Sequence, residues 1–225
     1  HVMLNETVQH NTVVSILMKI LKGLNALHVN GYIHRDLKPS TIFLSTDGNE
    51  VRVGGLGVAS KAGSDETLLA PTDKYSSPDL DVDRRSDIYS LGFIAYEMIV
   101  GQDEFKNLFQ DMYNVDNDKT RDRRWRNWHL DKSLSLPLLH EVLEGTPEEV
   151  SQIISRMMSK DPQYRYDDAD KAFEALKKLF DNQVLGPNAP NLGGNNAVQP
   201  LNAGSKNGNN IGGPAPIKPI DSKNK

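Results

Sequence analysis

Residues 34–41 read His-Arg-Asp-Leu-Lys-Pro-Ser-Thr, a polar stretch enclosed between two regular apolar patterns. Before it, at 12–29, apolar residues recur at the i, i+4, i+7 spacing of one helical face, and Gly31 then ends the pattern. After it, short apolar runs at 42–44 and 51–53 flank a turn rich in Asp, Gly and Asn, which predicts a β-hairpin. The stretch is therefore expected to be a loop held between a helix and a hairpin.

The same periodicity predicts three further helices, at about 86–100, 148–159 and 168–180. Gly101 ends the first of these. The Thr-Pro-Glu-Glu sequence that opens the second supplies a cap, a first-turn proline and first-turn acids. The sequence therefore predicts a mainly α fold with one small β-hairpin.

The composition excludes several classes of protein. The chain has 225 residues, 26 Lys and Arg against 30 Asp and Glu, and no Cys. It therefore has no disulfide framework, no Cys-ligated metal and no thiol nucleophile. The net charge of −4 gives no overall attraction to nucleic acid or to an anionic membrane. No apolar run is expected to reach the roughly 20 residues of a membrane span, so no membrane segment is expected in this chain.

Residues 184–225 differ in composition from the rest of the chain. They contain nine Asn, seven Gly and six Pro, no aromatic residue, and a net charge of +3. So few large apolar side chains cannot offset a backbone ordering cost of about 1–2 kcal/mol per residue. The sequence therefore predicts a folded unit at 1–183 followed by a disordered Asn/Gly/Pro-rich linker or tail at 184–225.

The stretch at 34–41 resembles the catalytic loop of eukaryotic-type (Hanks-type) Ser/Thr protein kinases, H-R-D-L-K-P-x-N, at seven of its eight positions. Four further segments follow in the family's order: GLG at 55–57 for D-F-G, YSSPD at 75–79 for Y-x-[AS]-P-E, RSDIYSLG at 85–92 for the opening of the central helix, and KDPQYR at 160–165 for K-D-P-x-x-R. Neither a Gly-rich loop nor a strand lysine precedes His34. The resemblance therefore implies a mainly α kinase C-terminal lobe with a small β-hairpin, the N-terminal lobe being absent from this chain.

The resemblance assigns catalytic roles to three residues. Asp36 corresponds to the base that accepts the proton of the substrate hydroxyl, Lys38 to the cation that stabilises the transferring phosphate, and Thr72 to the threonine that orients this pair. Two metal-binding positions are degenerate, because the catalytic-loop Asn is Thr41 here and the D-F-G aspartate is Gly55. Mg²⁺ prefers charged oxygen ligands, which neither residue offers. A loss of about 4 kcal/mol of transition-state stabilisation slows a reaction roughly a thousandfold, which favours inactivity.

Six other residues are expected to act structurally: His34, Arg35, Leu56, Asp79, Asp87 and Arg165. His34 and Leu56 are expected in the apolar spine of the lobe. Asp79 and Arg165 correspond to the family's buried ion pair, and the shorter reach of Asp than of Glu predicts a strained or water-bridged pair. Asp36 has a second interpretation, in which its carboxylate caps nearby backbone amides and serves no chemistry.

Two further stretches have alternative interpretations. Ser60, Ser64 and Thr67 lie in the activation segment, where they are either phosphorylation sites that pair with Arg35 or ordinary loop hydroxyls. Residues 121–128, RDRRWRNW, combine Arg with Trp as sites for single-stranded nucleic acid do. Because nearby Asp residues offset that charge, a partner-docking surface or loop packing is favoured, and nucleic acid is not expected as a partner.

These features, with the resemblance, predict a pseudokinase or kinase fragment that serves as a regulatory or scaffolding module. One alternative is a Ser/Thr protein kinase that transfers the ATP γ-phosphate to protein Ser/Thr when its N-terminal lobe is present. Another is a structural component of a larger assembly. No cofactor is expected for this chain, although the family uses ATP and Mg²⁺. The apolar surface around Ile33, Leu56 and the hairpin is expected to be covered by the N-terminal lobe or by a protein partner, and the location is expected to be cytoplasmic.

Overall fold

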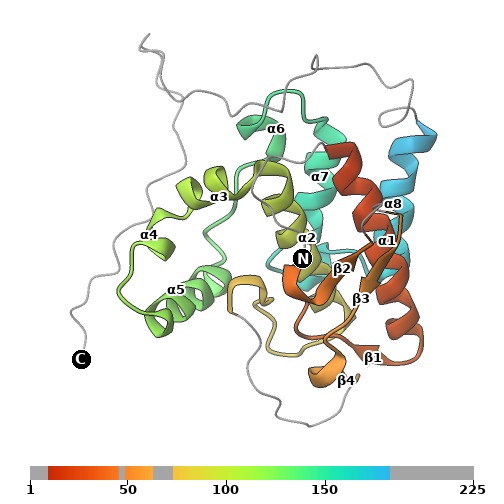
Figure 1. The fold of residues 1–225 in the computed structure, drawn as a ribbon, viewed down its shortest axis with the longest axis horizontal. Helices are drawn as coiled ribbons and strands as arrows, with labels where there is room; N and C mark the ends of the chain where they lie inside the picture. Colours follow the sequence, from red (N-terminus) through yellow and green to blue (C-terminus); the bar gives the residue numbers. More distant parts are fainter. Residues whose placement is uncertain (1–9, 46–48, 63–72, 183–225) are drawn as a thin grey trace.

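The computed structural model describes residues 10–45, 49–62 and 73–182, and Figure 1 shows them as a helical body with short strands along one side. The predicted tail at 184–225 lies outside the described residues, as do Ser64, Thr67 and Thr72. The helices within the described ranges are α1 (His10–Val29), α2 (Arg84–Val100), α3 (Gln102–Leu108), α4 (Gln110–Tyr113), α5 (Asp118–Leu130), α6 (Leu139–Val142), α7 (Glu148–Met157) and α8 (Ala169–Asp181). The four helices predicted from periodicity are confirmed as α1, α2, α7 and α8.

The strands form two small antiparallel pairs. The predicted hairpin is confirmed: β2 (Ile42–Leu44) pairs with β3 (Val51–Val53), with Ile42 opposite Val53. A second pair, β1 (Tyr32–Ile33) with β4 (Ser60–Lys61), is too short to produce a periodic signal in the sequence. Four single turns of 3-10 helix complete the described elements: η1 (Pro39–Thr41), η2 (Leu56–Val58), η3 (Asp73–Tyr75) and η4 (Pro162–Tyr164).

Helix α2 is the centre of the fold, because every residue from Ser86 to Val100 is buried. The Asp83 side chain caps its first turn by accepting the backbone N–H of Arg85, and Gly101, at φ 79°, ends it. A Cβ on Gly92 would lie 2.8 Å from the Met157 side chain, so a glycine is required where α2 and α7 approach each other. A helix buried on all sides must be surrounded by other elements, and α1, α3, α6, α7 and α8 all contact it.

Helix α1 packs against α2, α8 and β3 through one apolar face. Its fully buried residues recur with helical spacing and include Val13, Leu17, Ile20 and Leu24. By length and apolar content alone α1 would also be long enough to cross a membrane, which corrects the expectation that no run approaches that length. Its buried face inside the lobe is that of a core helix.

Residues 121–128 lie within helix α5, which corrects loop packing, one of the two interpretations favoured for them. The Asn117 side chain caps it by accepting the backbone N–H of Thr120. Trp125 and Trp128 are buried, with ring centroids 5.9 Å and 5.7 Å from that of Phe93. The i, i+3 spacing places both indoles on the inner face, where they pack in the core and are not available to stack on bases.

Candidate active site

The loop at 34–41 follows β1 and is fixed by the carboxylate of Asp87 on α2. The backbone N–H of His34 donates to Oδ2 and that of Arg35 to Oδ1, both at 2.9 Å. His28, on α1, places its Nε2 2.8 Å from the same Oδ2, and the two side chains are almost completely buried. Arg35 has φ 68°, a left-handed conformation that costs a non-glycine residue about 1–2 kcal/mol. The two hydrogen bonds that the Asp87 carboxylate accepts hold the loop in that conformation.

Asp36 and Lys38 form an ion pair at the start of the hairpin. The Lys38 Nζ lies 2.6 Å from Asp36 Oδ2, and both side chains are partly exposed. The backbone N–H of Asp36 donates to His34 Nδ1 at 3.3 Å, which connects the pair to the buried part of the loop. The two residues that the resemblance makes catalytic are therefore in direct contact, whereas Thr72 lies outside the described residues.

His34 connects this loop to the Gly-Leu-Gly segment at 55–57. The imidazole is fully buried, and its Nε2 lies 2.8 Å from the backbone oxygen of Gly54. A second bond runs from the Gly54 N–H to the carbonyl of Thr41 at 2.9 Å. The positions where the family carries its catalytic-loop Asn and its D-F-G aspartate are thus brought next to each other.

Thr41 uses its hydroxyl to hold the loop. Its Oγ1 donates to the carbonyl of Lys38 at 2.9 Å and lies 3.4 Å from the carbonyl of Asp36. The same oxygen accepts the backbone N–H of Lys38 at 3.1 Å, and the residue is buried. The hydroxyl is therefore engaged with the protein's own backbone on several sides.

Gly55 lies against the Thr41 methyl group. It adopts φ 75°, and a Cβ built on it would stand 2.5 Å from Thr41 Cγ2. Real Cβ atoms do not approach a carbon that closely, so any side chain at 55 requires Thr41 to move. Thr41 and Gly55, which the sequence identified separately, are therefore in direct contact and form one steric unit, in which the side chain at 41 limits what position 55 can carry.

The exposed apolar surface around Leu56 and the hairpin, on the side here called the cleft, is smaller than predicted. Leu56 is 47% exposed and Phe43, on β2, is 49% exposed, whereas Ile33 is buried. Ile33 faces inward because side chains alternate along β1, and its neighbour Tyr32 takes the outer face. The expectation that Ile33 contributes to an exposed floor is therefore wrong, and Leu56 does not lie within a buried spine.

Asp79 and Arg165 form a direct ion pair behind the loop. The guanidinium Nη1 and Nη2 lie 2.6 Å and 2.7 Å from the two carboxylate oxygens, and both side chains are buried. Arg165 Nε also donates to the carbonyl of Ser159, and the Ser86 hydroxyl donates to Asp79 at 2.8 Å. The prediction of a water-bridged pair is wrong, because these neighbours bring the arginine close enough for the shorter Asp side chain.

A second buried charge on α2 was not identified from the sequence. The Glu97 carboxylate accepts hydrogen bonds from the ammonium of Lys74 at 2.7 Å and from the hydroxyl of Tyr75 at 2.8 Å. These bonds connect η3 to the central helix. Burial lowers the pKa of Lys74 and raises that of Tyr75, and the Glu97 carboxylate opposes the first shift and adds to the second. The available signal was one acid within the apolar run Phe-Ile-Ala-Tyr-Glu-Met-Ile-Val, because a buried carboxylate requires partners.

The protein kinase domain model matches residues 1–180 of this chain. The chain belongs to the protein kinase family. Among its relatives are a protein named as a probable serine/threonine-protein kinase of Clostridium acetobutylicum, 30% identical over 190 residues, and Serine/threonine-protein kinase PknL of Mycobacterium tuberculosis, 29% identical over 167 residues. Serine/threonine-protein kinase 16 of Mus musculus is 30% identical over 176 residues.

These alignments cover 80%, 71% and 68% of this chain, and 26%, 38% and 51% of the respective relatives. The chain therefore spans between about a quarter and a half of the length of the kinases it matches. Family membership implies ATP and Mg²⁺ for kinases in general. In this chain the two positions that bind the metal in the family are Thr41 and Gly55.

Thr41 and Gly55 do not fit a Mg²⁺ ion. The ion prefers carboxylate and carbonyl oxygens in near-octahedral geometry. Gly55 has no side-chain oxygen, and the Thr41 hydroxyl is bonded to the backbone of Asp36 and Lys38. Within the part of the chain that the structure describes, no three His, Asp or Glu side chains gather closely enough to hold a metal.

Proposed function

We propose that this chain is the helical lobe of a pseudokinase and acts as a regulatory or scaffolding module. The observation that carries the proposal is the pair Thr41 and Gly55, where one hydroxyl is engaged with the backbone and the other position offers no side-chain oxygen. The surrounding lobe retains its loop, its central helix and its buried ion pair. Such a chain keeps the shape of a kinase lobe for binding partners while its metal chemistry is impaired.

The alternative is a Ser/Thr protein kinase that transfers the ATP γ-phosphate to protein Ser/Thr within a longer polypeptide. The observation in its favour is the ion pair of Asp36 and Lys38 at 2.6 Å, which retains the base and the phosphate-stabilising cation, with Thr72 as the third residue of the family set. Under this proposal another group would have to supply the metal ligands. The two functions predict different rates of phosphoryl transfer for the parent polypeptide, near background for a pseudokinase and at an ordinary kinase rate for the enzyme.

Phosphoryl transfer in the full-length natural polypeptide tests the proposal. The parent should transfer phosphate from MgATP at a rate close to background. The double variant Thr41→Asn with Gly55→Asp should raise the rate by up to about a thousandfold, if metal positioning contributes about 4 kcal/mol. Adding Asp36→Asn to the double variant should abolish that gain, which serves as the matched control.

Two results would contradict the pseudokinase proposal. One is a parent polypeptide that transfers phosphate to protein Ser or Thr at an ordinary kinase rate. The other is calorimetry showing that the chain as printed binds MgATP with a low-micromolar dissociation constant. A double variant that stays inert would instead indicate that Asp36 is structural, which leaves the scaffold function as the better explanation.

The proposal extends to the surroundings of the lobe. We place the kinase-like lobe at 1–183 and treat 184–225 as a linker or tail, on the composition of that segment. The exposed side chains of Phe43 and Leu56 support a nucleotide-binding lobe or a protein partner as the cover of this side of the cleft. A cytoplasmic location is part of the same proposal, by resemblance to the family.

A further inference from the structure

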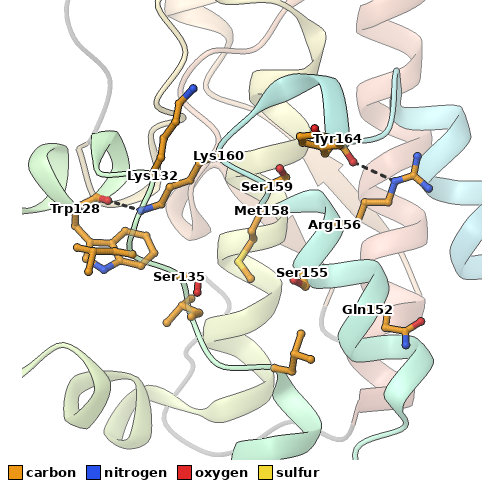
Figure 2. A pocket seen from close by; sticks show the side chains of 13 residues that line it. Trp128, Lys132, Ser135, Gln152, Ser155, Arg156, Met158, Ser159, Lys160 and Tyr164 are labelled. Atoms are coloured by element: carbon orange, nitrogen blue, oxygen red, sulfur yellow. Dashed lines mark hydrogen bonds between the residues drawn. The ribbon is translucent and has the colours of Figure 1, made fainter. Parts of the chain in front are cut away.

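A hollow of about 510 Å³ lies away from the cleft, between the non-helical segment at 132–138 and helix α7 (Figure 2). Met158 extends between the two walls, Ser135 comes from the segment, and Gln152 and Ser155 come from α7. The hollow shares no residue with the loop at 34–41 or with the segment at 55–57. Its properties are therefore independent of whether the lobe is catalytically active.

The charged side chains that line this hollow are all cationic. Its lining includes Lys132, Arg156 and Lys160 and not one carboxylate, although the chain as a whole carries a net charge of −4. Carboxylates lie at its border: Glu141 accepts the backbone N–H of Leu138, Glu148 accepts the side-chain amide of Gln152, and the charge of Asp131 acts on Lys160. Asp131 accepts the N–H and hydroxyl of Ser133, and Asp161 accepts the backbone N–H of Gln163. The side chains that line the hollow are therefore positive, on a protein of negative net charge and with carboxylates at the border.

Two of the three cations are held in place by the protein. Lys160 donates to the carbonyls of Trp128 and Asp131 at the end of α5, and its Nζ lies 3.9 Å from the centre of the Trp128 ring. Burial lowers the pKa of Lys160 to about 8, so the ammonium remains charged at neutral pH. Arg156 donates from Nε to the carbonyl of Tyr164 at 3.2 Å, as Figure 2 shows. Fixed cations lose less side-chain entropy when they bind an anion.

The walls also offer apolar surface. Leu134, Leu136 and Met158 are partly buried and line the hollow, and the ring of Tyr164 at its edge is 71% exposed. Serine and glutamine side chains on both walls add hydrogen-bonding groups. A ligand that suits this lining has carboxylates for the cations and an apolar side chain for Met158 and the leucines.

We propose that this hollow is a docking site for an extended acidic segment of a partner protein. The segment would place an apolar side chain against Met158 and its carboxylates near Lys132 and Arg156. The chain's own residues 184–225 do not have this chemistry, because they contain four Lys, one Asp and no Glu. Nucleic acid fits less well, because the tryptophan that borders the hollow is buried and already covered by Lys160.

Fluorescence anisotropy on the full 225-residue chain tests the proposal, with a labelled peptide in which glutamates flank a central leucine. Lys132→Glu should weaken binding at least tenfold, because it reverses an exposed charge at the hollow. Ser155→Asp should weaken it severalfold by placing a carboxylate on the α7 wall. Lys178→Glu on α8 makes the same change in net charge as Lys132→Glu and should leave binding within about twofold.

Three outcomes would overturn the proposal. The first is equal binding of a control peptide with glutamine in place of every glutamate. The second is an equal loss in Lys178→Glu and Lys132→Glu, which would show attraction to overall charge. The third is a single-stranded RNA that binds more tightly than the peptide and is displaced by the same variants. Circular dichroism of each variant distinguishes lost binding from lost folding.

Discussion

Two regions of the molecule treat polar groups in opposite ways. The frame consists of α2, the buried carboxylates Asp79, Asp87 and Glu97, and their donors, and the cleft contains Thr41 and Gly55. In the frame, Asp79, Asp87 and Glu97 are each held by two or more donors from other segments. In the cleft, the two positions that serve the metal in kinases carry Thr41 and Gly55, which contact each other. In this chain the buried charges of the frame are all paired although positions 41 and 55 carry residues that do not suit a metal.

One loop joins the two regions. Its first residues are bonded to Asp87 in the frame, and its last residue, Thr41, lies against Gly55 in the cleft. The frame therefore fixes the loop backbone whether or not the side chains farther along it act in catalysis. The predictions below test each side of this comparison separately.

The largest effect is expected at the ion pair in the frame. Asp79→Ala leaves Arg165 buried without its carboxylate and should reduce the free energy of unfolding by about 3–5 kcal/mol. Urea unfolding followed by circular dichroism measures this. Asp103→Ala, which removes an exposed carboxylate 3.9 Å from Lys106, is the matched control and should cost less than about 1 kcal/mol.

If Asp79→Ala costs no more than the surface control, the frame is less rigid than its geometry indicates. Asp79→Asn provides a second variant that keeps the shape of the side chain. It should fall between the alanine variant and the parent, because the amide oxygen still accepts one hydrogen bond from Arg165 but carries no charge.

An intermediate effect is expected at the steric unit in the cleft. Gly55→Ala should reduce the free energy of unfolding by about 1–3 kcal/mol, because its Cβ meets Thr41 Cγ2. In a Thr41→Ser background the methyl is gone, and the same change should cost at least about 0.5 kcal/mol less. A double-mutant cycle of urea unfolding measures the coupling. Gly57→Ala, with nothing within 4 Å of its Cβ, is the control and should change stability little.

Additive costs in this cycle would show that positions 41 and 55 are independent. The cost of Gly55→Ala would then come from its φ of 75° alone. That result would mean that the residues at 41 and 55 do not restrict each other, which contradicts the steric explanation. The absence of a side-chain oxygen at Gly55 would be unaffected.

The smallest effect is expected from any single one of three tyrosines around α2 at alkaline pH. Burial raises the pKa of Tyr75, Tyr89 and Tyr96 above the ordinary value near 10. The unfolded chain therefore loses these protons first, and stability falls as the pH rises above 10. Each tyrosine should contribute about 1 kcal/mol of that loss between pH 10 and pH 11.

Urea midpoints for the parent and Tyr96→Phe measure one such contribution. The Tyr96 hydroxyl has no hydrogen-bond partner among the described residues, so its removal breaks no bond. The variant should lose less stability than the parent across this interval. Equal slopes would show that Tyr96 is more accessible to water than its burial indicates. Lys160 acts in the opposite direction, because burial lowers its pKa to about 8 in the folded protein. Between about pH 8 and pH 10 the unfolded chain holds this proton and the folded protein does not, so the free energy of unfolding rises with pH.

The long regular elements could be predicted from the sequence because their signals are local. The apolar spacing of α1 and the glycine that ends α2 each lie within one stretch of chain. The substitutions at 41 and 55 could also be found, because the family motifs fix their places in order. Helix α5 was not predicted, since its charged residues obscured the inward spacing of Trp125 and Trp128.

The remaining features depend on how distant segments meet. Glu97 and Lys74 are separated by 23 positions, and no periodic pattern relates a residue on η3 to one on α2. The clash at Gly55 depends on its φ angle and on the orientation of the Thr41 side chain, neither of which a sequence of single letters records. The docking hollow likewise requires the 132–138 segment to lie beside α7.

The contact between Thr41 and Gly55 also restricts the order in which this chain could evolve back toward metal binding. An aspartate gained first at 55 meets the methyl of Thr41 and produces a less stable protein. A change made first at 41 relieves that obstacle but restores no charged ligand. Selection for phosphoryl transfer therefore rewards neither first step, and purifying selection on stability opposes one of them. Under the pseudokinase proposal, a loss of metal binding through both positions is therefore difficult to reverse by single mutations.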